Sequence, residues 1–514
     1  MNSIKKILIA NRGEIALRIM HTANSMGIEV VCLYTKGEEQ LPHVVMARNK
    51  ICIGEEGNLQ NTYLNIEKIL EVAKDQGCDA IHPGYGLLSE NANFAKRCEE
   101  SGFIFIGPRV KNISLMGDKI NSKKTMEVIN IPLIPGFHSS LEEMQQIQDS
   151  FLLEKAKEIK WPVLIKASAG GGGKGMRIVY KEENFFEELS MARSEAKKAF
   201  NNDLVFLEKW LDHPRHIEAQ ILCDSFGNCF FLGERECSIQ RRYQKIIEES
   251  PCIFLTKKNR DDLKSMALKI AQHINYLGVG TLEFLFQDGA FYFLEMNTRI
   301  QVEHPVTEMV HGLDLVELQI KVAQGEELKP TLLEEHLNGF GHAIEVRICA
   351  EVPEQNYMPA SGEFLHINVP QLPFNRFDFG YTSKNFLSVY FDPMLAKIIC
   401  FGMDRNSAIE KMIYTLKNSS FLGTNTNKNF LLAILGHEEF KKGNTFTHFL
   451  KNNHQDLMNF IQDEKITIEE MGYFLASIIN ENQNQHHMSE KSFEQSRKVD
   501  YWENIPTYKG MSCN

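Results

Sequence analysis

Several features that mark common protein classes are missing from this chain of 514 residues. No apolar run approaches the roughly eighteen residues that a membrane-spanning helix needs, and the apolar core of the N-terminal segment is too short for a secretory signal. The net charge of -11 argues against a nucleic-acid surface. The 11 cysteines show no CxxC spacing, so the sequence predicts neither a zinc site nor a disulfide framework. A reducing cytoplasm is the expected location.

Two common nucleotide-binding signatures are missing as well. No G-x-G-x-x-G follows the first predicted strand, so a dinucleotide-binding fold has little support. A glycine run, Gly170 to Gly173, is followed by Lys174 and then by Gly175, where a Walker loop would carry Ser or Thr. Because predicted strands flank this run, it describes a flap whose backbone N–H groups can close over phosphates. A plain solvent-exposed hairpin loop is the alternative.

What is present is an ordinary globular composition, 43% hydrophobic and 24% charged. The length suits about three domains. Residues 1–115 alternate predicted strands and helices, which is typical of a parallel α/β layer. Residues 116–330 contain strands separated by hairpin signals, which predicts an α+β domain with antiparallel sheets. Residues 331–450 form a third region that opens with a strand, and residues 451–514 form a tail with one helix and a polar linker.

One short segment, residues 294–309, is crowded with polar side chains. In an extended segment, residues of one parity point to the same side, so five of these side chains would face one way. A solvated row of charges is the alternative to a functional site. The five are Glu295, Asn297, Arg299, Gln301 and Glu303, with His304 next to them.

Glu283 and Glu295 lie on the two strands of a predicted hairpin around Asp288-Gly289. A two-residue turn alone would place the two glutamates on opposite faces of the sheet, whereas an odd-length loop or a bulge would bring both to one face. Two carboxylates at such a short separation need a cation between them, or the pKa of one of them must be raised. With Asn297 nearby, such oxygen ligands suit Mg²⁺.

Basic residues gather at a few positions of this acidic chain. Lys119 and Lys166 precede the flap and are candidates for phosphate binding, although each alone would be an ordinary surface lysine. Glu345 and Arg347 share one face of a predicted strand, where a structural ion pair is the alternative. A further cluster, for which a salt-bridged surface is the alternative, consists of Arg235, Arg241, Arg242 and Lys245.

Motifs along most of the chain resemble one enzyme family. In collinear order they are IANRGEIALRI, HPGYGLLSENANFA, LMGDK, SAGGGGKGMR, PRHIEAQ, CSIQRRYQKIIEE, EMNTRIQVEHPVTE, HAIEVRI and YFDPMLAK. Over residues 3–450 they resemble biotin carboxylase, and YFDPMLAK resembles the acyl-CoA carboxylase α-subunits (propionyl- or methylcrotonyl-type) more than the freestanding bacterial enzyme. The resemblance implies a multidomain α/β and α+β fold. Its parts would be a Rossmann-like N-terminal domain, a central ATP-grasp domain with a mobile lid, and an α+β C-terminal domain.

The resemblance also implies roles for individual residues. Glu303 would be the base that deprotonates bicarbonate, and Arg347 would stabilise the biotin enolate. Glu283 and Glu295 would hold one Mg²⁺, with Mn²⁺ as the alternative metal, and Glu295 with Asn297 would hold a second. Bicarbonate or biotin would also contact Lys245, Arg299, Gln301, the Val302 backbone, Tyr85 and Gly86. The implied ATP contacts, besides the two metal-binding glutamates, are Lys119, Lys166, Gly172, Gly173, Glu208, Lys209, Trp210, Leu211, His216, Gln240 and Tyr243.

Three positions depart from the family pattern. Tyr243 stands where the family usually has a ribose-contacting histidine, Leu87 replaces a phenylalanine beside the biotin site, and Ala169 replaces the first glycine of a five-glycine run. None of them removes a catalytic group. They bear on the affinity for nucleotide and biotin, not on the reaction.

The expected activity is ATP- and bicarbonate-dependent carboxylation of biotin through carboxyphosphate. The expected partners are a biotin carboxyl carrier protein and a carboxyltransferase subunit, in a homodimer or a larger carboxylase complex. Because the sequence contains no Met-Lys-Met, we expect biotin to be carried on a separate protein, with Tyr501, Trp502 and Tyr508 of a poorly ordered tail contacting partners. Another ATP-grasp ligase and a non-catalytic nucleotide-binding subunit are the rival readings.

Overall fold

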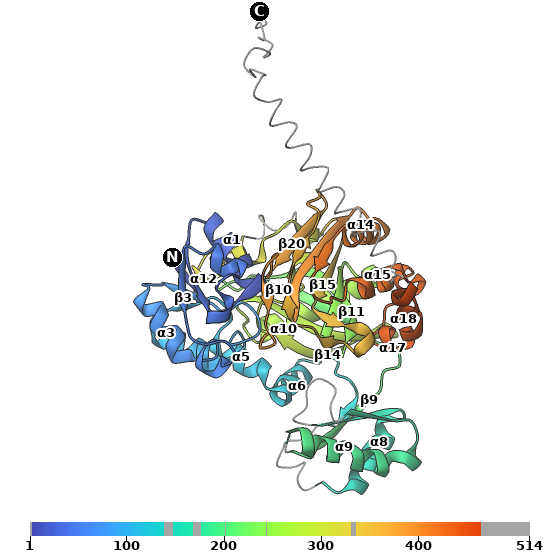
Figure 1. The fold of residues 1–514 in the computed structure, drawn as a ribbon. Helices are drawn as coiled ribbons and strands as arrows, with labels where there is room; N and C mark the ends of the chain where they lie inside the picture. The colour runs from blue at the N-terminus through green and yellow to red at the C-terminus, as the bar shows by residue number, and fades with distance from the viewer. Residues whose placement is uncertain are drawn as a thin grey trace, which may run out of the picture. The chain divides into compact units, whose positions relative to one another are not determined.

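The computed structural model describes residues 3–137, 147–167, 176–200, 202–242, 244–329, 331 and 336–463 (Figure 1). The chain forms two compact units, Met1–Met458 and Asn459–Asn514. The predicted tail helix and the three tail aromatics lie outside the described residues, as do Ala169, Gly172, Gly173 and Tyr243. Within the described ranges, no helix is long and apolar enough to cross a membrane.

A five-stranded parallel sheet forms the N-terminal part, as the alternating pattern predicted. Alternate residues of its central strand enter different cores: Ile7 and Ile9 pack with helix α1, whereas Leu8 packs with α3 and α4. This two-sided burial explains why β1 is apolar after Lys6. The strand order is β3 (Asn49–Cys52), β2 (Glu29–Tyr34), β1 (Lys6–Ile9), β4 (Ala80–His82) and β5 (Ile104–Phe105), and the helices are α1 (Gly13–Ser25), α2 (Pro42–Val45), α3 (Ile66–Asp75) and α4 (Ala92–Glu100).

The turn after β4 is fixed by Asn11, which follows β1. The Asn11 side-chain amide donates to the carbonyl oxygens of Pro83 and Tyr85, each at 2.7 Å. Gly84 has φ +62, and a Cβ there would lie 2.9 Å from the Asn11 amide nitrogen, so only glycine suits the position. The parallel sheet thus presents Tyr85 on a rigid turn.

A small antiparallel sheet follows, with helices α8 (Asp149–Ile159) and α9 (Phe185–Phe200). Its core joins Val163 and Ile165 of the sheet to Leu152 of α8 and Leu189 of α9. The glycine flap connects two of its strands and lies outside the described residues. The strand order is β6 (Gly136–Phe137), β9 (Val205–Lys209), β7 (Val163–Ala167) and β8 (Met176–Val179).

A large antiparallel sheet runs through the centre of the first unit and carries most of the polar residues of interest. It includes strands from both sides of the predicted domain boundary at residue 330; the domain limits themselves stay a prediction. Its strand order is β14 (Ala290–Asn297), β13 (Gly278–Gln287), β10 (Arg215–Cys223), β11 (Cys229–Arg241), β12 (Gln244–Ser250), β15 (His342–Cys349), β22 (Met394–Gly402) and β20 (Asn375–Phe379).

The two faces of β10 differ in polarity. Ile217, Ala219 and Ile221 pack in a core with helix α10 (Lys257–His273). The intervening residues His216 and Glu218 point to the other face, because successive side chains of a strand alternate. The large sheet therefore has an apolar face covered by α10 and a polar face on which charged groups gather.

Further helices and short strand pairs lie among the described residues. The helices are α5 (Val110–Gly117), α6 (Lys119–Val128), α11 (His304–His311), α12 (Leu315–Ala323), α14 (Arg405–Lys417), α15 (Lys428–Gly436), α16 (Glu438–Lys441), α17 (Phe449–Asn452) and α18 (His454–Asp463). Three two-stranded pairs are β16 (Glu351–Val352) with β17 (Met358–Pro359), β18 (Gly362–Glu363) with β21 (Phe386–Leu387), and β19 (His366–Asn368) with β23 (Ser420–Leu422).

The β13–β14 hairpin decides where Glu283 and Glu295 lie. Its turn is the two-residue Asp288-Gly289 turn, because Gln287 pairs with Ala290. The ladder then shifts by one residue between Glu283 and Phe284, and this bulge pairs Glu283 directly with Glu295. The prediction that an odd loop or a bulge brings both carboxylates to one face is confirmed by the bulge.

Two expectations need correction. The segment from Glu295 onward is a strand only as far as Asn297, so parity does not align Arg299, Gln301 and Glu303; a loop leading into α11 carries them. The structure also contains one disulfide, Cys223–Cys229, at the end of the β10–β11 hairpin, where the sequence predicted no disulfide framework. Eight other cysteines in the described ranges are free.

Candidate active site

A cavity of about 1390 Å³ opens beside the polar face of the large sheet. Within the part of the chain that the structure describes, every residue to which the family resemblance assigns a role lines it, whereas Arg235, His304 and Glu345 do not. The lining residues come from the β4 turn, the small sheet, the large sheet and the loop before α11. Lys166 lines it from β7 and Trp210 from the segment after β9, whereas Tyr85 lines it from the turn after β4 and Arg347 from β15.

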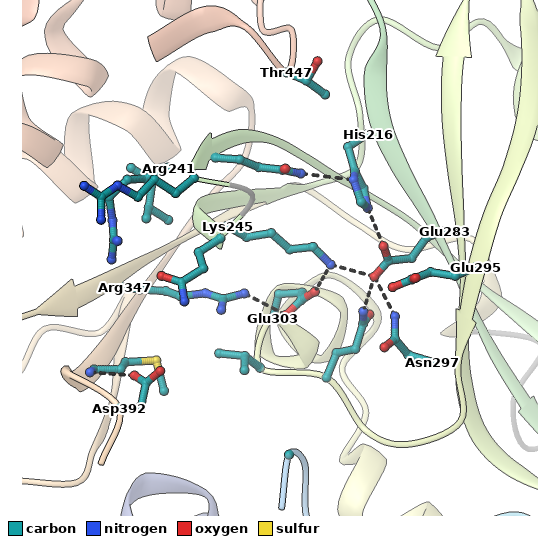
Figure 2. A pocket seen from close by; sticks show the side chains of 18 of the residues that line it. His216, Arg241, Lys245, Glu283, Glu295, Asn297, Glu303, Arg347, Asp392 and Thr447 are labelled. Carbon is teal, nitrogen blue, oxygen red and sulfur yellow. Dashed lines mark hydrogen bonds and ion pairs between the residues drawn. The ribbon is translucent and has the colours of Figure 1, made fainter. Parts of the chain in front are cut away.

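Lys245, at the start of β12, contacts three carboxylates on the polar face of the large sheet. Its ammonium lies 2.8 Å from Glu283 Oε1 and 2.8 Å from Glu303 Oε1, and it also donates to Glu218. Burial would lower the pKa of Lys245, but these three carboxylates raise it well above its ordinary value. The lysine is therefore charged at neutral pH and joins three strands and a loop (Figure 2).

Glu303 is held at both carboxylate oxygens. Lys245 occupies Oε1, and Arg347 Nη2 lies 2.9 Å from Oε2. Burial and Glu218 would raise the pKa of Glu303, but Lys245 and Arg347 hold it below its ordinary value. Glu303 is therefore an ionised carboxylate in a water-poor site, as a proton acceptor must be.

Arg347, on β15, is oriented from behind by Glu248 of the neighbouring strand. Arg347 Nε donates to Glu248 Oε1 at 2.7 Å, and Glu248 lies opposite Glu345 across the β12–β15 ladder. Burial, only partly offset by Arg347, raises the pKa of Glu248 to about 7. The arginine thus spans two carboxylates and reaches the cavity with its guanidinium.

Glu283 and Glu295 form the like-charged pair that the bulge creates. Glu283 Oε1 accepts hydrogen bonds from Asn297 Nδ2 at 2.7 Å and Gln301 Nε2 at 2.8 Å, in addition to Lys245. Glu295 accepts none from any described residue, and burial followed by the charge of Glu283 raises its pKa. Figure 2 shows the two carboxylates side by side.

These oxygens fit a hard divalent cation. Two carboxylates on one face, one of them without a hydrogen-bond donor, gain from a cation between them, and oxygen-only donors suit Mg²⁺. Ligand atoms of His216, Glu218 and Glu283 also lie within 4.8 Å of one another. There, Glu283 and Glu218 raise the pKa of His216 to about 9 against the effect of burial.

A further buried carboxylate, Glu208 of β9, lines the cavity. Glu208 accepts from Lys123 Nζ at 2.7 Å and from Lys166 Nζ at 2.9 Å. Burial would raise the pKa of Glu208, but the two lysines lower it to about 2. Glu208 therefore orients Lys166, which the sequence analysis assigned to phosphate binding.

Lys209 ends β9, Trp210 and Leu211 follow it, and all three line the cavity. The Lys209 ammonium donates to the carbonyls of Lys160 and Trp161, each at 2.9 Å, so its side chain braces the turn before β7. The Trp210 ring stacks on His448 with centroids 4.9 Å apart. A flat, partly apolar wall of this kind suits an aromatic base.

Arg299, expected at bicarbonate, is engaged with protein groups here. Its Nε donates to Glu90 at 2.9 Å and its Nη2 to Asn297 Oδ1 at 2.8 Å. Arg299 and Asn297 both line the cavity, whereas Glu90 does not. Tyr85 and Gly86 also line it, and the Tyr85 hydroxyl donates to Glu14.

Sequence reasoning missed several buried charges behind the cavity. Glu218 joins Lys245 to Arg235, whose fully buried guanidinium also donates to Gln301 Oε1 at 2.5 Å and Thr307 Oγ1 at 2.9 Å. Arg235 was singled out only as part of a basic cluster. The signal for Glu218 was its place as a lone acid in the apolar strand HIEAQIL, which alternation points to the polar face.

Comparisons with known proteins agree with this arrangement. The chain matches "Biotin carboxylase, N-terminal domain" over residues 3–113, "Carbamoyl-phosphate synthase L chain, ATP binding domain" over 118–331 and "Biotin carboxylase C-terminal domain" over 345–452. A biotin carboxylase of Allochromatium vinosum is 43% identical over 448 residues, which are 87% of this chain and 98% of that protein. The chain belongs to the biotin carboxylase family.

Two further relatives place the chain within the biotin carboxylase family. The α-subunit of rat mitochondrial methylcrotonoyl-CoA carboxylase is 46% identical over 89% of this chain, and the match spans 63% of the subunit's length. A solved structure, the biotin carboxylase domain dimer of Hydrogenobacter thermophilus 2-oxoglutarate carboxylase with MgADP, ADP and bicarbonate, has a TM-score of 0.82 and 41% identity. It covers 89% of this chain and 99% of that one.

Proposed function

We propose that this chain catalyses the ATP- and bicarbonate-dependent carboxylation of biotin on a carrier protein, the first half-reaction of an acyl-CoA carboxylase. The observation that supports it most is the environment of Glu303, a buried ionised carboxylate held between Lys245 and Arg347. It faces the cavity that also contains Lys166 and Trp210. A proton acceptor thus lies between two cations, in the same cavity as residues suited to bind the phosphates and the base of a nucleotide.

The first step needs a base because bicarbonate is a poor nucleophile until it loses its second proton. Glu303 takes that proton, while Lys245, Arg299, Gln301 and the Val302 backbone hold the anion. The resulting dianion attacks the γ-phosphorus of ATP, ADP leaves, and carboxyphosphate forms. Each of these side chains carries a charge or an N–H that favours the added negative charge.

Binding of ATP falls to the other side of the cavity. Lys119, Lys166 and His216 carry the positive charges that phosphate oxygens need, and residues 208–211 with Gln240 surround the base and ribose. We also include the glycine flap and Tyr243 among the ATP contacts. Their inclusion rests on the sequence, because both lie outside the described residues. Mg²⁺ bound by Glu283, Glu295 and Asn297, with Mn²⁺ as the alternative, supplies charge neutralisation at the phosphates.

The second step uses the Arg347 side of the cavity. Carboxyphosphate breaks down to CO₂ and phosphate, and the phosphate takes the N1′ proton of biotin. The enolate oxygen that results faces the Arg347 guanidinium, and Tyr85 and Gly86 line the entry for biotin. The nitrogen then attacks CO₂ to give carboxybiotin.

The partners are proposals as well. A carrier protein would present the biotin, and a carboxyltransferase subunit would pass the carboxyl group to an acyl-CoA of the acetyl, propionyl or methylcrotonyl type. A homodimer or a larger carboxylase complex is supported by the dimer named for the Hydrogenobacter domain and by the α-subunit relative. A cytoplasmic location stays a prediction.

A carboxylation assay tests the proposal. The protein is incubated with MgATP, radiolabelled bicarbonate and free biotin, and acid-labile label on biotin is measured after removal of free CO₂. We expect label that requires both ATP and the protein. ATP cleavage that does not depend on bicarbonate, with no labelled biotin, would contradict the proposal and favour a different ATP-grasp ligase.

A further inference from the structure

A buried chain of polar contacts leads from the biotin side of the cavity to the loop that carries Glu303. The Tyr85 hydroxyl donates to Glu14 at the start of α1. Glu14 Oε1 lies 3.2 Å from Lys397 Nζ, and the same ammonium donates to the carbonyl oxygen of Val302 at 2.7 Å. Lys397 thus links the N-terminal helix, strand β22 and the loop before α11.

Lys397 is fully buried, and an isolated ammonium in such a place is very costly. Glu14 and, at 3.8 Å, Asp378 of β20 balance it. Glu345 of β15 also faces it; burial would lower the pKa of Lys397, but Glu14, Glu345 and Asp378 raise it. Arg347 lies opposite Lys397 across the β15–β22 ladder. Because it is also positively charged, it does not balance the charge of Lys397. The lysine stays charged and aims one N–H at a backbone carbonyl.

That carbonyl lies between two residues of the bicarbonate site. The peptide joining Val302 to Glu303 is trans, so the Glu303 N–H points away from the Val302 oxygen that Lys397 holds. The preceding carbonyl, of Gln301, is held in the same way by His304 Nδ1 at 2.8 Å, which fixes the Val302 N–H. Neither N–H donates to any described residue.

Two adjacent backbone N–H groups without partners form an anion-binding concavity. Val302 and Glu303 both line the cavity. A purely structural ion pair between domains would explain the contact of Lys397 with Glu14. It would not require the additional hydrogen bond from Lys397 to the Val302 carbonyl. The hydrogen bond to the Val302 carbonyl is the contact that can orient the Glu303 N–H toward a bound anion.

We propose that Lys397 is a positioning residue for the bicarbonate site. By holding the Val302 carbonyl it directs the Glu303 N–H toward the bound anion and keeps the Glu303 carboxylate between Lys245 and Arg347. Through Glu14 it joins this peptide to Tyr85 on the biotin side. The inference rests on the proposed biotin carboxylase activity and deepens its bicarbonate subsite.

The test compares Lys397→Met with a matched control, Lys411→Met. Lys411 Nζ donates to the Phe401 carbonyl at 3.0 Å, a bond of the same kind that lies away from the cavity. Bicarbonate-dependent ATP cleavage is measured while bicarbonate and ATP are varied separately. For Lys397→Met we expect the KM for bicarbonate to rise about tenfold or more, the factor one charged hydrogen bond is worth, while the KM for ATP changes less than about twofold. Lys411→Met should match the wild type in both.

Removing the lysine leaves Glu14 buried with less compensation, so a charge-balanced variant, Lys397→Met with Glu14→Gln, is measured beside it. The same rise in the KM for bicarbonate is expected in the double variant. A loss of kcat with an unchanged KM for bicarbonate would show a merely structural role and overturn the inference. An inactive wild type would refute the proposed function instead, so the two failures can be told apart.

Discussion

Glu303 is the residue on which the proposed chemistry depends, because it combines burial, ionisation and contact with two cations. The sequence could place it in a polar segment, but parity along one strand was the wrong reason. The structure brings it to the site through the loop before α11, where Lys245 and Arg347 reach it from β12 and β15. Long-range pairing of strands, which no local pattern reveals, supplies both cations.

Replacing this base should stop the reaction at its start. For Glu303→Gln we expect bicarbonate-dependent ATP cleavage and biotin carboxylation to fall together, by about a hundredfold or more, as for loss of a general base. Steady-state rates with and without biotin measure both. A variant that still cleaves ATP at the wild-type rate when bicarbonate is present would show that another group takes the proton.

Arg347 should act later than Glu303. For Arg347→Ala we expect a loss of about 2.7–4 kcal/mol of transition-state stabilisation in biotin carboxylation, by analogy with oxyanion-hole donors. Bicarbonate-dependent ATP cleavage should lose less, although Arg347 also contacts Glu303. Equal losses in the two assays would place the role of Arg347 before carboxyphosphate formation.

At the scale of elements, the β13–β14 hairpin shows what a sequence can and cannot predict. Parity alone required a bulge or an odd loop if Glu283 and Glu295 were to share a site, and the structure has the bulge. Parity could not say where the extra residue lies. It also could not reveal that Glu283 would accept from Lys245, Asn297 and Gln301 at once.

This like-charged pair predicts opposite effects on stability and metal binding. Cross-strand like charges destabilise a hairpin, so Glu295→Gln should raise the melting temperature of the metal-free protein. It should also raise the Mg²⁺ concentration needed for ATP cleavage by about tenfold or more, the loss typical even of an outer ligand partner. A variant with unchanged Mg²⁺ dependence would remove Glu295 from the metal site.

His43 in helix α2, away from the cavity, should make the stability of the fold depend on pH. His43 is buried with neither ring nitrogen bonded, and burial, with Arg12, lowers its pKa to about 4 against the effect of Glu38. The unfolded chain takes up a proton near pH 6.5 but the folded one does not, so stability is lost as pH falls from about 6.5 to about 4. For one histidine the loss is about 3 kcal/mol.

Unfolding by denaturant at pH 7 and at pH 4 measures this difference in wild type and in His43→Leu. The variant should lose about 3 kcal/mol less stability on acidification. His82 is buried similarly and remains in both proteins, so its contribution cancels. An equal pH dependence in the two proteins would mean that His43 is protonated in the fold.

Across the whole molecule, the parallel layer and the antiparallel sheets were predictable because apolar patterns and turn signals repeat locally. Strand β3 offers little local signal, because its sequence NKIC is short and half polar. The eight-stranded sheet was not predicted as one sheet, since it joins β12 to β15 across the expected domain boundary. Buried charges such as Lys397 had only one signal, a lone lysine in an apolar strand.

The joining of that sheet is what makes one catalytic cavity from distant segments. Lys245 comes from β12, Arg347 from β15 and Glu303 from the loop after β14, and Tyr85 reaches the same cavity from the parallel sheet. Carboxyphosphate must form and be consumed in one place, because it is hydrolytically fragile. A single cavity with the proposed base, cations and biotin entry would meet that requirement.

The fate of the bicarbonate oxygens tests this account most directly. If bicarbonate deprotonated by Glu303 attacks the γ-phosphorus of ATP, one of its oxygens must appear in the phosphate released. With heavy-oxygen-labelled bicarbonate, mass spectrometry of the phosphate formed during biotin carboxylation should find one labelled oxygen per phosphate. Phosphate whose new oxygen comes only from water would contradict the central claim.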